Sequence, residues 1–135
     1  MIAIVCVDDN KGMMFNHRCQ SQDRVLREDI LQEASGKAVW MNAYSAKQFA
    51  DTDPDRLKIC EKFLEKADCG EFCFVEDKDL RPYLGQVEEI VLYKWNRVYP
   101  ADFRFEVDLS SWKLEETKEF SGSSHEKITK ERYTR

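Results

Sequence analysis

Residues 1–7, MIAIVCV, form a continuous apolar run that stops at two aspartates. A run of this length without polar alternation is typical of a strand covered on both faces. Acidic residues follow it directly, and neither a basic segment nor a cleavage site accompanies it. We therefore predict a buried first strand and no secretion signal.

Helical periodicity begins after the polar stretch that follows this strand. Leu26 and Ile30 fall on one face at helical spacing, and Gly36 stands where a helix would stop. We predict an amphipathic helix over residues 22–35, with Ser21 as its N-cap.

Shorter elements are predicted along the middle of the chain. Apolar runs indicate strands at residues 38–41, 57–60, 72–75 and 89–95. Ser45 and Gln48 have the spacing of a capping box, which predicts a short helix through Phe49. Another short helix is predicted over residues 79–84.

The hydrophobic period changes to two after Pro100. Apolar and charged residues alternate over residues 103–109, as on a half-exposed antiparallel strand. Residues 112–120 and 125–133 predict two further strands, joined across a polar turn at 121–124.

The element order indicates the fold class. The chain opens with alternating strands and helices and ends in a hairpin, so we predict an α/β fold. We expect a mixed, mainly parallel sheet flanked by helices, with a C-terminal antiparallel hairpin, in a single domain over residues 1–135.

Composition limits the partners of the protein. With 26 acidic against 21 basic residues, the net charge of -5 offers no general attraction to nucleic acid or an anionic membrane. Five cysteines, an odd number, fit reduced thiols better than a disulfide framework. We expect a cytoplasmic protein that contacts neither nucleic acid nor membrane.

Metal ligands are scarce. Three residues separate Cys69 from Cys73, no second pair exists, and His17 and His125 are the two histidines of the chain. We expect buried or inert thiols and no metal site.

The order of elements, together with several strings of residues, resembles dihydrofolate reductase from end to end. The strings are IVCVDDNKG at residues 4–12, GKAVWM at 36–41, PDRLKI at 54–59, YPADFRF at 99–105 and WKL at 112–114. No string is specific by itself, so their common order carries the resemblance. It implies the family's fold and places its mobile active-site loop at residues 12–20.

The resemblance also implies candidate site residues. Asp23 is the nearest match to the carboxylate that relays a proton to the pterin, although the helix dipole also favours an acid there for structural reasons. Arg56 falls where the family clamps a substrate carboxylate. Tyr44 and Ser45 open the helix whose N-terminus holds phosphates in the family.

Residues 75–79, VEDKD, stand where the resemblance implies a glycine pair. In the family that pair lets backbone amides approach the cofactor pyrophosphate. Side chains would block this approach and acids would repel the anion, so we expect no cofactor and no ordinary NADPH binding. Arg18 and Arg24 belong to a basic rim around the first loop and helix that could receive another anion.

We therefore expect a divergent dihydrofolate-reductase-fold protein that binds a nucleotide-like or other anionic small molecule. The candidate ligand-binding residues are Arg18, Arg24, Tyr44, Ser45 and Arg56. The alternative is an NAD(P)H-dependent reductase of a pterin or pyrimidine, of the dihydrofolate reductase or riboflavin-pathway type.

A metal-dependent ribonuclease or other hydrolase fits the sequence least, because histidines are so few. A Ser-His-Asp arrangement around residues 123–125 is conceivable, but neighbouring residues on a hairpin point to opposite faces.

Overall fold

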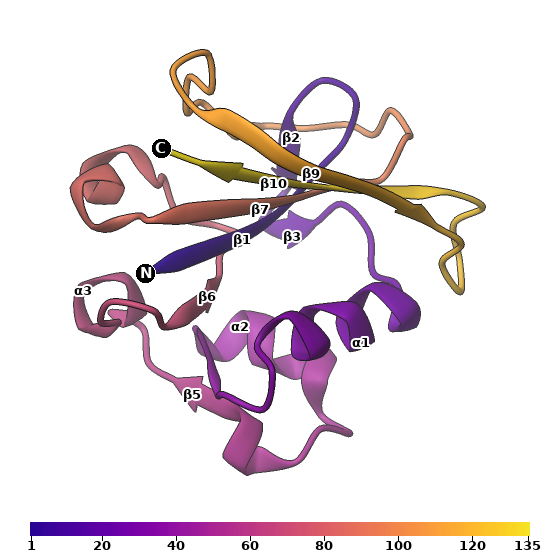
Figure 1. The fold of residues 1–135 in the computed structure, drawn as a ribbon. Coiled ribbons are helices and arrows are strands. Elements are labelled where there is room, and N and C mark those ends of the chain that lie inside the picture. Colours follow the sequence, from indigo (N-terminus) through magenta and orange to yellow (C-terminus); the bar gives the residue numbers. More distant parts are fainter.

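A computed structural model describes all 135 residues. Its centre is a seven-stranded sheet in the order β5-β4-β6-β1-β7-β10-β9 (Figure 1). The strands are β1 (Ile2–Val7), β4 (Val39–Met41), β5 (Leu57–Ile59), β6 (Phe72–Phe74), β7 (Glu89–Lys94), β9 (Lys113–Phe120) and β10 (Ile128–Thr134). The first five in sheet order are parallel, and β10 runs antiparallel to both of its neighbours, β7 and β9. The predicted fold class is confirmed.

Strand β1 is buried on both faces, as its composition predicts. Ala3 and Val5 belong to one hydrophobic cluster, whereas Ile2 and Ile4 belong to a second cluster across the sheet. Each fully buried aliphatic side chain contributes roughly 1.5–3 kcal/mol. The sheet therefore has a core on each side.

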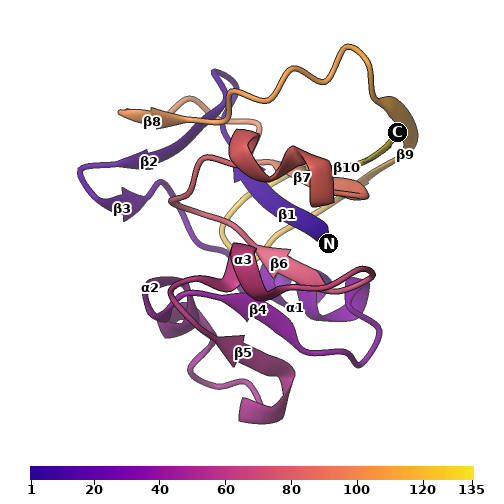
Figure 2. The same cartoon turned by 90° about the vertical axis from the view of Figure 1, so that its left-hand side faces the viewer.

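Helices cover both faces of the sheet. Helix α1 (Arg24–Glu33) packs Leu26 and Ile30 into the second cluster. Helix α3 (Phe63–Lys66), which the sequence patterns did not predict, packs Phe63 into the first. Figure 2 shows α3 in front of β6 and β4, with α1 behind them.

The N-cap of α1 differs from the predicted one. Asp23, not Ser21, precedes the helix, and its Oδ1 accepts hydrogen bonds from the amides of Val25 and Leu26. The predicted Ser21 cap is therefore wrong, because the helix starts two residues later than its periodicity indicated.

The predicted capping box of Ser45 and Gln48 is also wrong. Asn42 caps α2 (Ala43–Ala46), and its side-chain oxygen accepts from the Ser45 amide at 3.0 Å. The chain leaves β4 in an extended conformation at Asn42, so this residue, at the strand end, is the one that reaches the first turn.

Three 3₁₀ helices complete the helical elements. They are η1 (Lys47–Phe49), η2 (Pro54–Arg56) and η3 (Arg81–Gln86). None of the helices has the length and apolar character needed to cross a membrane.

A separate three-stranded sheet contains β3 (Arg18–Cys19), β2 (Gly12–Phe15) and β8 (Phe103–Arg104) in that order. Much of the expected active-site loop is thus a β-hairpin. Over residues 103–109 the predicted alternation of burial is present, but only two residues pair as a strand. Strand β2 is too short to pair with residues 105–109 as well.

Strands β9 and β10 form the predicted C-terminal hairpin, but β10 begins at Ile128, three residues late. Residues 121–127 form an irregular connection in which the Gly122 amide donates to the His125 carbonyl. This connection folds back to Asp23 at the start of α1.

Candidate functional site

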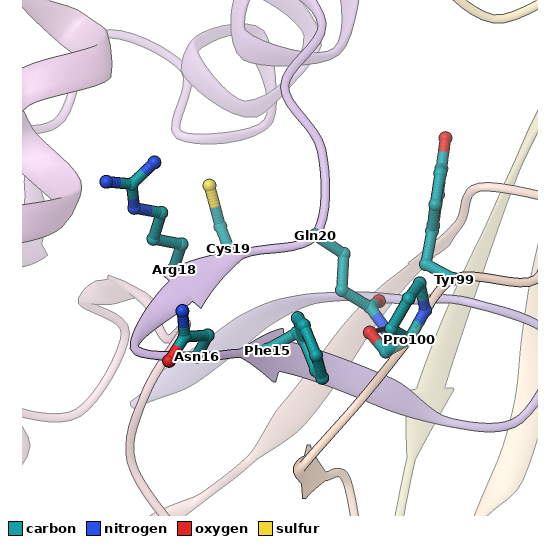
Figure 3. Close-up of a pocket in the computed structure, with 7 residues that line it drawn as sticks. All are labelled: Phe15, Asn16, Arg18, Cys19, Gln20, Tyr99 and Pro100. Atoms are coloured by element: carbon teal, nitrogen blue, oxygen red, sulfur yellow. Dashed lines mark hydrogen bonds between the residues drawn. The ribbon is translucent and has the colours of Figure 1, made fainter.

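A cavity of about 260 Å³ lies between the β2–β3 hairpin and the segment that precedes β8 (Figure 3). Its lining residues are Phe15, Asn16, Arg18, Cys19, Gln20, Tyr99 and Pro100. Gln20 Nε2 donates to the Pro100 carbonyl at 3.2 Å, and the Asn16 amide donates to Asp102 Oδ2 at 2.9 Å. These bonds hold the two walls together.

The hairpin turn places Arg18 opposite Phe15. Asn16 and His17 form a two-residue turn with φ values of 52° and 62°. Such turns require left-handed backbone at both positions, which asparagine tolerates better than histidine. Phe15 and Arg18 are therefore paired across the hairpin, and both line the cavity.

Arg18 gives the cavity its charge. Its side chain is exposed and forms no ion pair, and no acidic residue lines the cavity. Figure 3 shows Arg18 at one end of the lining residues and Tyr99 at the other, with Phe15 between them. Phe15 is 47% exposed despite its size. A lining with a guanidinium at one end and two aromatic rings along it suits a ligand that combines an anionic group with a ring.

Asp23, the expected proton relay, is 2% exposed. Its two oxygens accept six hydrogen bonds, from the amides of Val25, Leu26, Ser123 and Ser124, the Ser124 hydroxyl and His125 Nδ1. Burial alone would raise the pKa of Asp23, but these donors outweigh burial and hold the pKa well below its ordinary range. The carboxylate stays ionised. Groups of the protein itself occupy its hydrogen-bond acceptor sites, which leaves few for a ligand.

His125 extends this network to the cavity wall. Its Nδ1 lies 3.0 Å from Asp23 Oδ2. Its Nε2 lies 3.1 Å from Ser21 Oγ and 3.0 Å from the hydroxyl of Tyr99, which lines the cavity. The ring stacks on Trp95 with centroids 4.5 Å apart.

Sequence reasoning missed this cluster. It treated His125 as the first residue of a strand, in which neighbouring side chains diverge. Ser124 and His125 lie instead in the irregular connection, and both side chains contact Asp23. The objection drawn from strand geometry is therefore wrong here. The polar run at residues 121–125 was the available signal.

Arg24 and Arg56 line a different cavity, of about 400 Å³, between α1 and the segment from Gln48 to Arg56. Arg24 pairs with Glu28 at 3.0 Å, and Arg56 donates to the Leu31 carbonyl at 2.8 Å. Three arginines and three acidic residues line this cavity, so their charges cancel. The structure thus separates these two arginines from Arg18.

Tyr44 and Ser45 lie on α2 but line neither cavity. The Tyr44 hydroxyl accepts a hydrogen bond from the Cys19 amide at 2.8 Å, which ties α2 to the strand that carries Arg18. Ser45 is buried next to Glu76. Neither residue therefore contacts the cavity directly, and Tyr44 is bonded to one of its lining residues, Cys19.

The acidic junction at residues 75–79 is buried at its start and half-exposed from Asp77 onward. Glu76 is 8% exposed and accepts from Gln48 Nε2 at 2.9 Å, while Asp77 accepts from Asn42 Nδ2 at 2.8 Å. Burial raises the pKa of Glu76, and the neighbouring Ser45 and Gln48 oppose this only in part. The junction therefore folds inward, against α2.

The sequence also predicted buried or inert thiols and no metal site. No three His, Cys, Asp or Glu side chains come close enough together to hold a metal ion. All five cysteines are free thiols; Cys73 is buried as expected, whereas Cys69 is exposed.

The arrangement of strands and helices defines an α/β protein with the dihydrofolate reductase fold. A dihydrofolate reductase from Enterococcus faecalis, complexed with NADP(H) and RAB-propyl, is similar with a TM-score of 0.69 and 9% identity. The similarity covers 99% of this chain and 95% of that chain. No protein-family model and no curated protein matches the sequence. The likeness establishes the fold, and function has to be argued from the site.

Proposed function

We propose that this protein binds a small anionic molecule with a nucleotide-like ring in the cavity beside Arg18. One observation carries the proposal: an arginine without an ion pair faces a cavity that no acidic side chain lines. A hydrogen bond to a charged group contributes about 1.5–3 kcal/mol. Phe15 and Tyr99 supply aromatic faces for the ring.

The polar residues of the lining can orient such a ring. The side-chain amide of Asn16 both donates and accepts hydrogen bonds, whereas Gln20 Nε2 already donates to Asp8 and Pro100, so its Oε1 is the atom left to accept. The cavity at Arg24 and Arg56 is less suited to an anion, because its acids offset its arginines and backbone carbonyls already bind Arg56.

We propose further that the ligand is not reduced by the ordinary NADPH-dependent reaction. The resemblance implies glycines at residues 75–79, where this chain has a buried Glu76 and a half-buried Asp77. At an effective dielectric constant of 20, a like charge 4 Å away costs about 4 kcal/mol. Asp23 also supports this view. Its oxygens are occupied by hydrogen bonds from the protein, so the carboxylate is poorly placed to pass a proton to a ligand.

The binding proposal is tested by calorimetric titration with AMP and, as a neutral match, adenosine. We expect AMP to bind at least about 10-fold more tightly, because the phosphate gains a charge-assisted bond to Arg18. The variant Arg18→Ala should remove this preference. Arg97→Ala, at another exposed arginine, should keep it. Equal binding of AMP and adenosine by the wild type would contradict the proposal.

The competing reading is an NAD(P)H-dependent reductase of a pterin or pyrimidine, and the Enterococcus neighbour was solved with NADP(H). Incubation with NADPH and dihydrofolate separates the two readings. We expect no loss of the nicotinamide absorbance beyond that of a protein-free mixture. Catalysed oxidation of NADPH would overturn the proposal in favour of the reductase.

A further inference from the structure

Three side chains from two distant segments meet beside the cavity. Ser21 Oγ lies 3.1 Å from His125 Nε2, and His125 Nδ1 lies 3.0 Å from Asp23 Oδ2. A hydroxyl, an imidazole and a buried carboxylate in this order form the relay that activates a serine as a nucleophile.

Asp23 sets the tautomer of the imidazole. An ionised carboxylate only accepts hydrogen bonds, so His125 Nδ1 carries the proton that Asp23 accepts. Nε2 is then the basic nitrogen, and it faces the Ser21 hydroxyl. Stacking on Trp95 fixes the plane of the ring. Asp23 is thus a positioning residue, and His125 is the base.

Tyr99 links this relay to the cavity. Its hydroxyl lies 3.0 Å from the same His125 nitrogen, and its side chain lines the cavity. Ser21 is half-buried and directly follows Gln20, another lining residue. In Figure 3 the chain leaves Gln20 in the direction in which the Tyr99 hydroxyl points. Ser21 is therefore next in sequence to one lining residue and shares the His125 nitrogen with another, Tyr99.

We propose that Ser21 is a nucleophile for acyl transfer and that the protein hydrolyses small carboxylic esters that enter this cavity. Ser21 Oγ attacks the ester carbonyl carbon while its proton passes to His125 Nε2. The bond from that carbon to the alcohol oxygen breaks, and the alcohol leaves with the proton. The product of this step is an acyl group on Ser21.

Water completes the reaction with the same base. It adds to the acyl carbon and gives a proton to His125, which returns that proton to Ser21 Oγ as the carboxylic acid departs. The Tyr99 hydroxyl shares His125 Nε2 with Ser21, so it has to release that nitrogen before Nε2 takes the serine proton. This inference goes beyond ligand binding and does not depend on Arg18, because the reacting atoms belong to other residues.

The test uses diisopropyl fluorophosphate, a small neutral reagent that reacts with activated serines and loses fluoride. We expect one adduct per chain by intact mass, located on Ser21 by peptide mapping. Ser21→Ala should give none, and His125→Gln should react on the order of 100-fold more slowly, since it lacks the base. Ser121→Ala removes an exposed serine of the same connection and should react at the wild-type rate.

An unlabelled wild type, an adduct on a residue other than Ser21, or equal rates for His125→Gln and wild type would overturn the inference. The wild-type result stands without any variant, and circular dichroism of Ser21→Ala shows whether that variant folds. Labelling of Ser21 in a protein without preference for AMP would support this inference and overturn only the binding proposal.

Discussion

At the scale of single residues, Asp23 connects parts of the chain that are far apart in sequence. It caps α1 and also receives the amides of Ser123 and Ser124. Gly122 permits this approach, since a Cβ there would lie 2.3 Å from Asp23 Oδ2. One carboxylate thus joins the first helix to the last hairpin.

The first prediction is that Asp23→Asn destabilises the protein by about 2–4 kcal/mol at neutral pH, because the amide nitrogen of asparagine faces donors that now lack an acceptor. The folded state lowers the pKa of Asp23, so its contribution is fully present above the ordinary value of 3.8 and is lost as pH falls below it. Urea unfolding at about pH 7 and about pH 3 measures both effects.

The control for this prediction is Asp9→Asn, which alters an exposed carboxylate. It should leave the free energy of unfolding within about 0.5 kcal/mol of wild type. If Asp23→Asn proved as stable as Asp9→Asn at neutral pH, the assigned network would be wrong.

At the scale of elements, an ionic contact fastens β10 to α1. Lys130 is 8% exposed and pairs with Asp29 at 2.8 Å and with Glu33. Arg132, two residues further along β10, also pairs with Glu33. Burial raises the pKa of Glu33, but the two cations outweigh it and lower the pKa below its ordinary value. A charged contact therefore lies beside the apolar core.

We expect Lys130→Met to cost about 3 kcal/mol, because it leaves the partly buried Asp29 without its cation and Glu33 with Arg132 alone. Lys127→Met is the matched control, since Lys127 forms a 2.8 Å pair with Glu119 at an exposed site. That pair should contribute at most about 1 kcal/mol. Denaturant unfolding of both variants decides the point, and equal losses would refute the importance of the buried contact.

The elements themselves differ in how well the sequence predicts them. Strand β1 and helix α1 follow from runs and spacings inside one segment, and both were predicted to within a few residues. Helix α3 was missed because its four residues are too few to show a period. The pairing of β8 was overestimated, since alternation reports burial and not the presence of a partner strand.

At the scale of the whole molecule, the two hydrophobic clusters share the same central strands. Ile4 and Val5 are neighbours in sequence but belong to opposite clusters. Disruption of one cluster therefore exposes the strand that supports the other, which favours unfolding as one unit.

We predict that urea unfolding followed by far-ultraviolet circular dichroism and by tryptophan fluorescence gives coincident transitions. Trp95 reports on one cluster and Trp40, packed against the other, reports on the second. Two separated transitions would show that the chain contains more than one folding unit.

The sequence by itself determined the strands, the long helix and hence the fold class, because hydrophobic periodicity is a local property that each segment carries alone. It also supplied Arg18, Asp23 and the acidic junction as residues of interest. Only the tertiary structure decided which of them meet. It buried Glu76, placed Arg24 and Arg56 away from Arg18, and brought Ser21 to His125. That last contact joins residues 104 positions apart, and no local pattern encodes the path of the connection that makes it.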